Sequence, residues 1–191
     1  DLGTDRINVF AIEGGKLAPR DRAQLKPGSG PRHLALHPQG KLLYVINELE
    51  GSVACHGYDP ATGHVQEERQ RISTTPADYT GQKSGAELLM HPSGRFVYAS
   101  NRKLKSDHPL ADSVAAFSID ASGKLAQLQY WNEGVHFPRA MTMAPDGSHV
   151  YVLNQKGDTI LRLRIDGQTG KLDQPTVVAK VPTPVCLVFA A

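Results

Sequence analysis

The chain has 191 residues, of which 40% are hydrophobic and 21% charged, and its formal net charge is +2. This composition is typical of a packed globular protein and excludes a disordered chain. Charges of both signs are interspersed and no long apolar segment occurs, so we expect neither a nucleic-acid partner nor a membrane span.

The first predicted elements are two strands joined by a turn within residues 1–30. Residues 5–12 favour a strand, Gly14 and Gly15 favour a turn, and a second strand follows from Lys16. They match only the outer two strands of a unit that occurs in full later. Since the chain starts inside this unit and without methionine, we expect it to be a piece of a longer protein whose targeting signals cannot be judged.

The first complete unit spans residues 31–83 and contains four predicted strands. A His-Pro-Gln-Gly turn at 37–40 separates the first two strands, because proline presets φ and glycine permits the turn geometry. An Asp-Pro-Ala-Thr-Gly turn at 59–63 separates the last two. The predicted strands cover residues 32–36, 41–47, 53–58 and 64–72.

Residues 84–137 and 138–183 repeat the same order of strands and turns. The turn prolines Pro38, Pro92 and Pro145 are spaced by 54 and 53 residues, and the asparagines that end each second strand have the same spacing. A repeat of roughly 50 residues with several short strands is typical of a β-propeller blade. The sequence therefore predicts an all-β fold: one partial propeller domain of four-stranded antiparallel blades.

The last segment, residues 184–191, matches only the innermost strand of a blade. The predicted arc would thus have an apolar blade face at each end and one strand without a partner. Because a blade needs neighbours to cover both of its faces, we expect association with the missing part of the protein or with another copy.

The antiparallel order also predicts where polar residues meet. The first strand of each unit begins, and the second strand ends, at the same end of the blade, which we call the mouth; the His-Pro-x-Gly turns lie at the opposite end, the turn face. Polar residues at the predicted mouth are Arg32, His33, Asn47, Glu48, Glu87, Asn101, Arg102, Arg139, Asn154 and Gln155.

One mouth position differs from unit to unit, while the turns and core stay alike. His33 and Glu87 lie five residues before their turn prolines, and Ala140 has this place in the third unit. A site on a symmetric scaffold would break symmetry in this way. The alternative is that the inner ends are polar simply because a central channel holds water.

The residue types at the mouth favour an anionic substrate with a labile carbon–oxygen bond. Arginine forks bind carboxylate or phosphate, His33 could act as a general base, and Glu87 as a base or acid. We expect structural roles for His37 and His91 on the turn face. His64, His108, His136 and His149 are scattered, and no pair of these four has metal-ligand spacing. Cys55 and Cys186 are expected to be free thiols.

Several motifs together resemble the lactonase family of seven-bladed β-propellers, which includes propeller-type 6-phosphogluconolactonases and carboxymuconate cyclases. They are Gly-Pro-Arg-His at 30–33, Tyr-Val-Ile-Asn-Glu at 44–48, Pro-Ala-Asp-Tyr-Thr-Gly at 76–81, His-Pro-Ser-Gly-Arg at 91–95, Ser-Asn-Arg at 100–102 and Phe-Pro-Arg at 137–139. The resemblance implies the C-terminal half of such a ring, closed by pairing of its last inner strand with N-terminal strands. It also implies no metal or organic cofactor, and catalytic positions at Arg32, His33, Glu87 and Arg139.

The resulting functional hypothesis is hydrolysis of a sugar lactone, 6-phosphogluconolactone above others. Arg32 and Arg139 would hold the anionic group and polarise the carbonyl, while His33 or Glu87 would activate water. Asn47, Asn101 and Asn154 would orient hydroxyl groups, and Glu48, Arg102 and Gln155 are expected to bind the substrate as well. A muconate-type lactonising cycloisomerase and a non-catalytic propeller that binds a metabolite or protein stay open. We expect a cytoplasmic protein with a small lactone or carboxylate as its partner.

Overall fold

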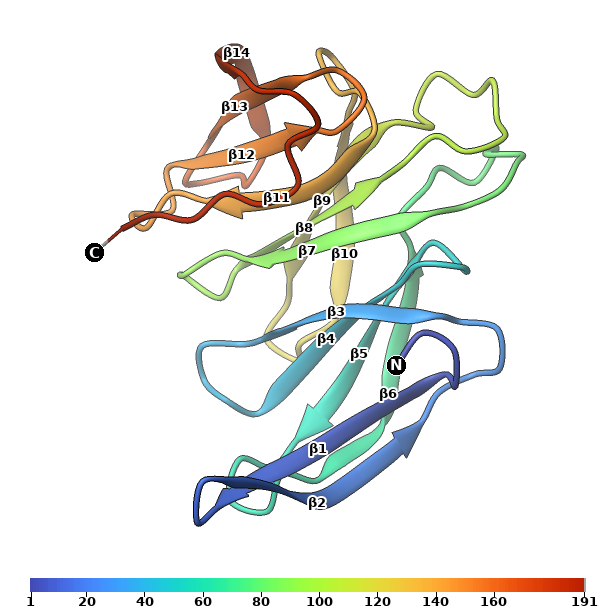
Figure 1. The fold of residues 1–191 in the computed structure, drawn as a ribbon, viewed down its shortest axis with the longest axis vertical. Coiled ribbons are helices and arrows are strands. Elements are labelled where there is room, and N and C mark those ends of the chain that lie inside the picture. The colour runs from blue at the N-terminus through green and yellow to red at the C-terminus, as the bar shows by residue number, and fades with distance from the viewer. Residues whose placement is uncertain (191) are drawn as a thin grey trace.

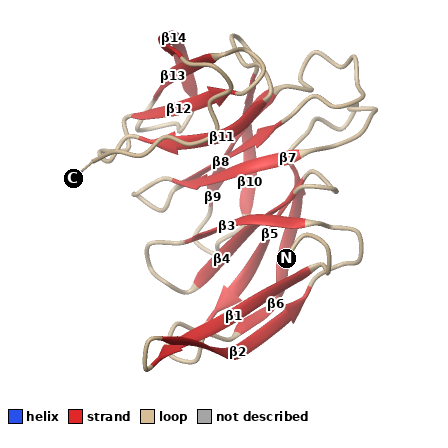
Figure 2. Ribbon diagram, in the orientation of Figure 1, coloured by secondary structure: helices blue, strands red, loops and turns tan. Residues whose placement is uncertain are grey.

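The computed structural model describes residues 1–190, and Ala191 lies outside the described residues. Fourteen strands form three four-stranded sheets and one two-stranded hairpin, all antiparallel (Figures 1 and 2). Residues 1–190 contain no helix, and hence none that could cross a membrane. The predicted all-β fold of partial propeller blades is confirmed.

The strands occupy nearly the predicted positions. The hairpin consists of β1 (Arg6–Glu13) and β2 (Lys16–Gln24). The first blade has β3 (Pro31–Leu36), β4 (Leu42–Asn47), β5 (Ser52–Tyr58) and β6 (Val65–Ser73). The second has β7 (Gly85–Met90), β8 (Phe96–Asn101), β9 (Ser113–Ile119) and β10 (Leu125–Trp131). The third has β11 (Pro138–Met143), β12 (His149–Asn154), β13 (Thr159–Ile165) and β14 (Leu172–Lys180).

The first strands of the blades lie closest to one another. In each sheet the strands follow in chain order from β3, β7 or β11 outward, and β7 contacts both β3 and β11. Figure 1 shows the sheets stacked as a fan with these three strands along one side. The inner edges of the blades therefore line a common axis, as in a propeller.

The core lies between the sheets and not within any one of them. Tyr44, Val53 and Phe117 pack between the first and second blades, and Tyr98 and Leu163 between the second and third. Strands β4 and β8 are buried over almost their whole length, because neighbouring blades cover both of their faces. Each blade is thus stabilised by the next.

Two repeated hydrogen bonds join neighbouring blades at the turns. The Tyr44 hydroxyl donates to the Gly123 carbonyl at 2.8 Å, and the Tyr98 hydroxyl donates to the Gly170 carbonyl at 2.9 Å. On the turn face, His37 Nε2 lies 3.0 Å from the Gly94 carbonyl oxygen, and His91 makes the same contact at 3.1 Å. The structural role expected for both histidines agrees with this position.

Glycine is required at the turn that receives His37. Gly94 has φ of +70°, and a Cβ added there would lie 2.7 Å from the His37 ring nitrogen. A side chain would therefore strain the backbone and also push the histidine out of its contact.

A third repeated contact joins the outer strands. Gln70 donates to the Leu125 carbonyl at 2.8 Å and accepts from the Leu125 amide at 2.6 Å. Gln129 makes the same two contacts with Leu172 in the next blade. Where the hairpin meets the first blade, Asp21 accepts from the Val65 amide at 2.8 Å. The spacing of the blades is thus fixed at the outer, middle and turn-face positions.

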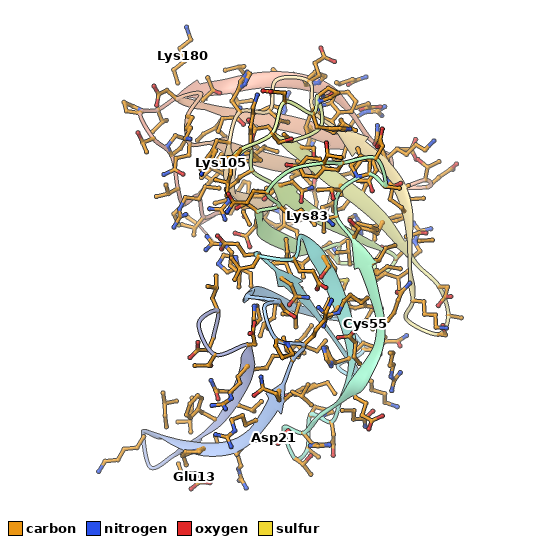
Figure 3. All side chains as sticks on the ribbon, turned by 90° about the vertical axis from the view of Figure 1, so that its right-hand side faces the viewer. Glu13, Asp21, Cys55, Lys83, Lys105 and Lys180 are labelled. Carbon is orange, nitrogen blue, oxygen red and sulfur yellow. The ribbon has the colours of Figure 1, made fainter. Side chains whose placement is uncertain are left out.

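One end of the fan is the hairpin, and the other is the third blade with the C-terminal segment. The hairpin packs on the first blade through Ile7, but its other side exposes Ile12 and Leu17, at 78% and 71%. Figure 3 shows Glu13 on this hairpin at one end of the molecule and Lys180 at the other. Residues 184–190, predicted as part of a closing inner strand, form no strand here. An inner strand needs an aligned backbone beside it, and the described residues supply none.

Candidate functional site

A local irregularity places charged residues at the mouth of all three blades. Pairing of the inner strand shifts between Pro31 and His33 in β3, between Gly85 and Leu88 in β7, and between Pro138 and Ala140 in β11. The residues inside these shifts are Arg32, Ala86 with Glu87, and Arg139. Such β-bulges redirect side chains and are frequent next to active sites.

His33 and Glu87 form a close pair across the first two blades. His33 Nδ1 lies 2.5 Å from Glu87 Oε1, which also accepts from the Leu88 amide at 3.1 Å. The Glu87 side chain is 16% exposed and that of His33 is 42% exposed. A carboxylate can only accept, so Nδ1 must donate, and Nε2 becomes the basic nitrogen of the neutral ring.

The Glu87 backbone is fixed by the third blade. Its amide donates to the Ser100 hydroxyl at 2.9 Å, and that hydroxyl donates to the Pro138 carbonyl at 3.0 Å. This chain of bonds runs from β7 through β8 to β11. The position of the carboxylate thus depends on two blades besides the one that carries His33.

Arg32 is held by the second blade and by Glu48. Its Nε donates to the Ala86 carbonyl at 3.1 Å, and its Nη1 lies 3.4 Å from Glu48 Oε2. The other Glu48 oxygen lies 2.7 Å from Arg102 Nη2. Glu48 therefore bridges two arginines, one from each of the first two blades.

Arg102 is the most deeply buried residue of this bridge. Its side chain is 6% exposed, its Nη2 also donates to the Gly85 carbonyl at 3.2 Å, and its guanidinium carbon lies 5.7 Å from the centre of the Phe137 ring. The Arg102 Nε is buried without a hydrogen-bond partner among residues 1–190. This geometry supports a role in positioning Glu48 in place of the substrate contact that the sequence predicted.

Arg139 completes the cationic group and is the least constrained of the three arginines. Its half-buried side chain has no hydrogen-bond or ion-pair partner among residues 1–190. Burial, followed by the charges of Arg102 and Arg139, lowers the pKa of Arg32, and the glutamates act in the opposite direction. Three guanidinium groups thus stand against two carboxylates, a balance that favours an anionic ligand.

The asparagines predicted to contact substrate are fully buried. Asn47 donates to the Ser52 hydroxyl at 3.0 Å, Asn101 to the Thr74 carbonyl at 2.7 Å, and Asn154 to the Gly134 carbonyl at 2.8 Å. These bonds fix the loops that follow the second strands. The geometry does not support the hydroxyl-orienting role, because the side chains turn into the blades.

Gln155 stays at the mouth but lies apart from the charged network. It is half-buried, and its backbone amide donates to the Phe137 carbonyl at 3.2 Å. A hollow of about 270 Å³ borders the network on the other side, between β1 and β3, and Arg32 and His33 line it. Within residues 1–190, no group of three or more His, Cys, Asp or Glu side chains could hold a metal ion.

Comparisons with known proteins agree with this architecture. A family model described as "Lactonase, 7-bladed beta-propeller" matches residues 1–189. The chain is 32% identical to a 6-phosphogluconolactonase from Bacillus subtilis over 190 residues, covering 99% of the chain and 52% of that protein. A 6-phosphogluconolactonase from Formosa agariphila is 33% identical over 180 residues, covering 91% of the chain and 48% of that protein.

Two solved structures are similar along nearly the whole chain. A periplasmic gluconolactonase from Pseudomonas aeruginosa has 27% identity and a TM-score of 0.87, covering 100% of this chain and 52% of its own. A protein from Lactobacillus plantarum has 32% identity and a TM-score of 0.88, covering 97% and 52%. This chain therefore spans about half the length of the relatives that it matches.

Proposed function

Because this chain belongs to the lactonase family of seven-bladed β-propellers, we propose that the complete protein hydrolyses a sugar lactone, with 6-phosphogluconolactone as its substrate. The observation that carries the proposal is the His33–Glu87 pair beside the arginines of the mouth. Relatives named 6-phosphogluconolactonase support the choice of substrate.

The His33–Glu87 pair supplies the base. His33 Nε2 takes a proton from a water molecule, whose oxygen attacks the lactone carbonyl carbon and forms a tetrahedral oxyanion. Glu87 stabilises the imidazolium that results, since its carboxylate accepts from Nδ1. When the ring carbon–oxygen bond breaks, the imidazolium returns the proton to the leaving oxygen. The products are a hydroxyl group and a carboxylic acid, which then loses its proton to solvent and becomes a carboxylate.

The arginines stabilise the charge that develops. Arg32 is already fixed by the Ala86 carbonyl and Glu48, so little reorganisation is needed when negative charge appears on the carbonyl oxygen. Arg139 has no competing partner among the described residues and can donate to the same oxygen or to the product carboxylate. Both contacts strengthen as the oxyanion forms, which is the condition for catalysis.

The test is hydrolysis of 6-phosphogluconolactone by the complete protein, measured as acid release above the spontaneous rate. We expect His33→Ala to reduce kcat by about 100-fold or more, because a general base contributes that much. His64→Ala is the matched control, since His64 is an exposed histidine at an outer turn. A muconolactone is assayed in parallel. Turnover of the muconolactone alone, or full activity of His33→Ala, would contradict the proposal.

A further inference from the structure

A second cationic pocket lies at the mouth and takes no part in the chemistry proposed above. It has a volume of about 340 Å³ and is lined by Lys103, Leu104, Asp112, His136, Phe137 and Lys156. Lys103 follows β8, Lys156 follows β12, and His136 precedes β11. Since the mouth consists of these same connections, the pocket and the catalytic group open at the same end of the blades.

Phe137 is the wall shared by the pocket and the catalytic group. Lys156 Nζ lies 4.0 Å from the ring centre, and the Arg102 guanidinium carbon lies 5.7 Å from it. The two cations are therefore within about 10 Å of each other, both in range for attraction to the ring. Phe137 is separated from the bulged Arg139 only by Pro138.

The backbone of Phe137 is unusual. Its φ is +53°, a left-handed conformation that bulky residues rarely adopt. Such conformations persist only where the surroundings enforce them, and they cluster at ligand sites. The preceding backbone amide, that of His136, donates to Asn154 Oδ1 at 3.0 Å. The aromatic wall is thus held in place before any ligand arrives.

The pocket offers unused hydrogen-bond donors. Within residues 1–190, Lys103 Nζ has only a 3.9 Å contact with the fully exposed Asp107. The Lys103 backbone amide donates to Asp112 Oδ1 at 2.6 Å. Neither the Lys156 ammonium group nor the His136 ring has a hydrogen-bond partner among residues 1–190. The pocket thus has two ammonium groups and an imidazole against the single Asp112 carboxylate, a balance that suits a compact oxyanion.

We propose that this pocket binds a phosphoryl group, and that in catalysis it holds the phosphate of a phosphorylated sugar lactone while the ester lies beside His33 and the arginines. The second part rests on the proposed function. The relatives give it a reason, since one is named 6-phosphogluconolactonase and another gluconolactonase, two names that differ by this group. Arg102 and Phe137 connect the pocket to the network that holds Arg32.

The kinetic test compares the phosphorylated and unphosphorylated lactones on the complete protein and on the double variant Lys103→Ala/Lys156→Ala. We expect kcat/KM for the phosphorylated lactone to fall about tenfold or more, because two charge-assisted hydrogen bonds are removed. The value for the unphosphorylated lactone should stay within about twofold. Lys105→Ala is the matched control: this lysine, labelled in Figure 3, belongs to the same loop but does not line the pocket. Equal losses for both lactones, or no loss, would overturn the substrate assignment.

A binding test is independent of turnover. Inorganic phosphate is titrated into the protein and followed by NMR at the His136 ring, with sulfate and chloride as comparison anions. Saturable shifts that the double variant loses would support the pocket, and their absence would refute it. If phosphate binds but neither lactone is hydrolysed, the proposed function fails while the phosphoryl site stands. Phosphate should also inhibit hydrolysis competitively in the unsubstituted protein and more weakly in the double variant.

Discussion

The turn face and the mouth of the blades are built from the same repeat and use it differently. On the turn face, His37 and His91 contact the next turn at 3.0 and 3.1 Å, nearly identical distances. At the mouth, the residues aligned with His33 are Glu87 and Ala140. Equivalent positions stay alike where every blade needs the same contact with its neighbour. They diverge where one ligand must be contacted from several directions.

The largest effect that would test this contrast is expected at Glu87. Glu87→Gln preserves the shape of the side chain but removes the charge that stabilises the His33 imidazolium. We expect kcat to fall about 100-fold with little change in KM, because the charge matters only once the proton has moved. Steady-state kinetics measure this, and Glu133→Gln on the exposed surface is the control. A rise in KM at constant kcat would show that Glu87 merely binds substrate.

The next largest effect is expected for Glu48→Gln, which should reduce both stability and activity. It removes the partner of the nearly buried Arg102, so we expect a loss of about 2–4 kcal/mol in the free energy of unfolding. Arg32 would also lose one of its two anchors, and kcat/KM should fall about tenfold. Urea denaturation and kinetics measure the two effects. Glu67→Gln, an exposed neighbour on β6, should change neither. Full activity with lost stability would mean that the bridge serves the fold alone.

Glu50 tests whether every glutamate near the mouth is catalytic. Burial raises the pKa of Glu50, but hydrogen bonds from Lys26, Ser52 and Arg71 outweigh this effect and lower the pKa to about 2. Its stabilising contribution is therefore complete well above the ordinary carboxyl pKa and is lost as the pH falls toward 2.

The corresponding variant is Glu50→Gln. At neutral pH it should cost about 2 kcal/mol of unfolding free energy, a difference that disappears near pH 2. Its kcat should be unchanged. Denaturant curves across pH 2–7 measure this, and a cost that does not vary with pH would contradict the assignment.

The smallest effect concerns the contacts between blades. Tyr98→Phe removes the hydroxyl that donates to the Gly170 carbonyl and leaves that carbonyl unpaired. We expect a loss of about 1 kcal/mol in unfolding free energy and no change in kcat. Tyr130→Phe is the comparison, since the hydroxyl of the half-buried Tyr130 has no hydrogen-bond partner among residues 1–190. Equal costs for the two variants would mean that burial, and not the contact between blades, matters.

The strands could be predicted from sequence because their boundaries depend on local turn chemistry. The Pro-x-Gly turns and the regular spacing place each strand to within a residue or two of its observed ends. The gathering of Arg32, His33, Glu87 and Arg139 at one end also followed from the antiparallel order. Side-chain direction did not. Asn47 stands at the mouth in sequence but turns into its blade.

The remaining features depend on contacts between blades that no single repeat contains. The bulges at Arg32 and Arg139 are shifts of pairing with a second strand, and sequence period alone does not show them. The Glu48 bridge joins residues 54 positions apart, Glu48 and Arg102, across two sheets. Residues 184–190 resemble an inner strand in composition, but a strand exists only where a partner aligns with it.

The most direct test of the His33–Glu87 pair is a double-mutant cycle on kcat for lactone hydrolysis by the complete protein. If Glu87 acts by orienting and stabilising the His33 ring, the variant carrying both His33→Ala and Glu87→Gln should be about as slow as His33→Ala alone. If the two residues act separately, kcat of the double variant would fall, relative to the unsubstituted protein, by the product of the two single losses. That outcome would contradict the account of the mouth as one coupled acid–base pair.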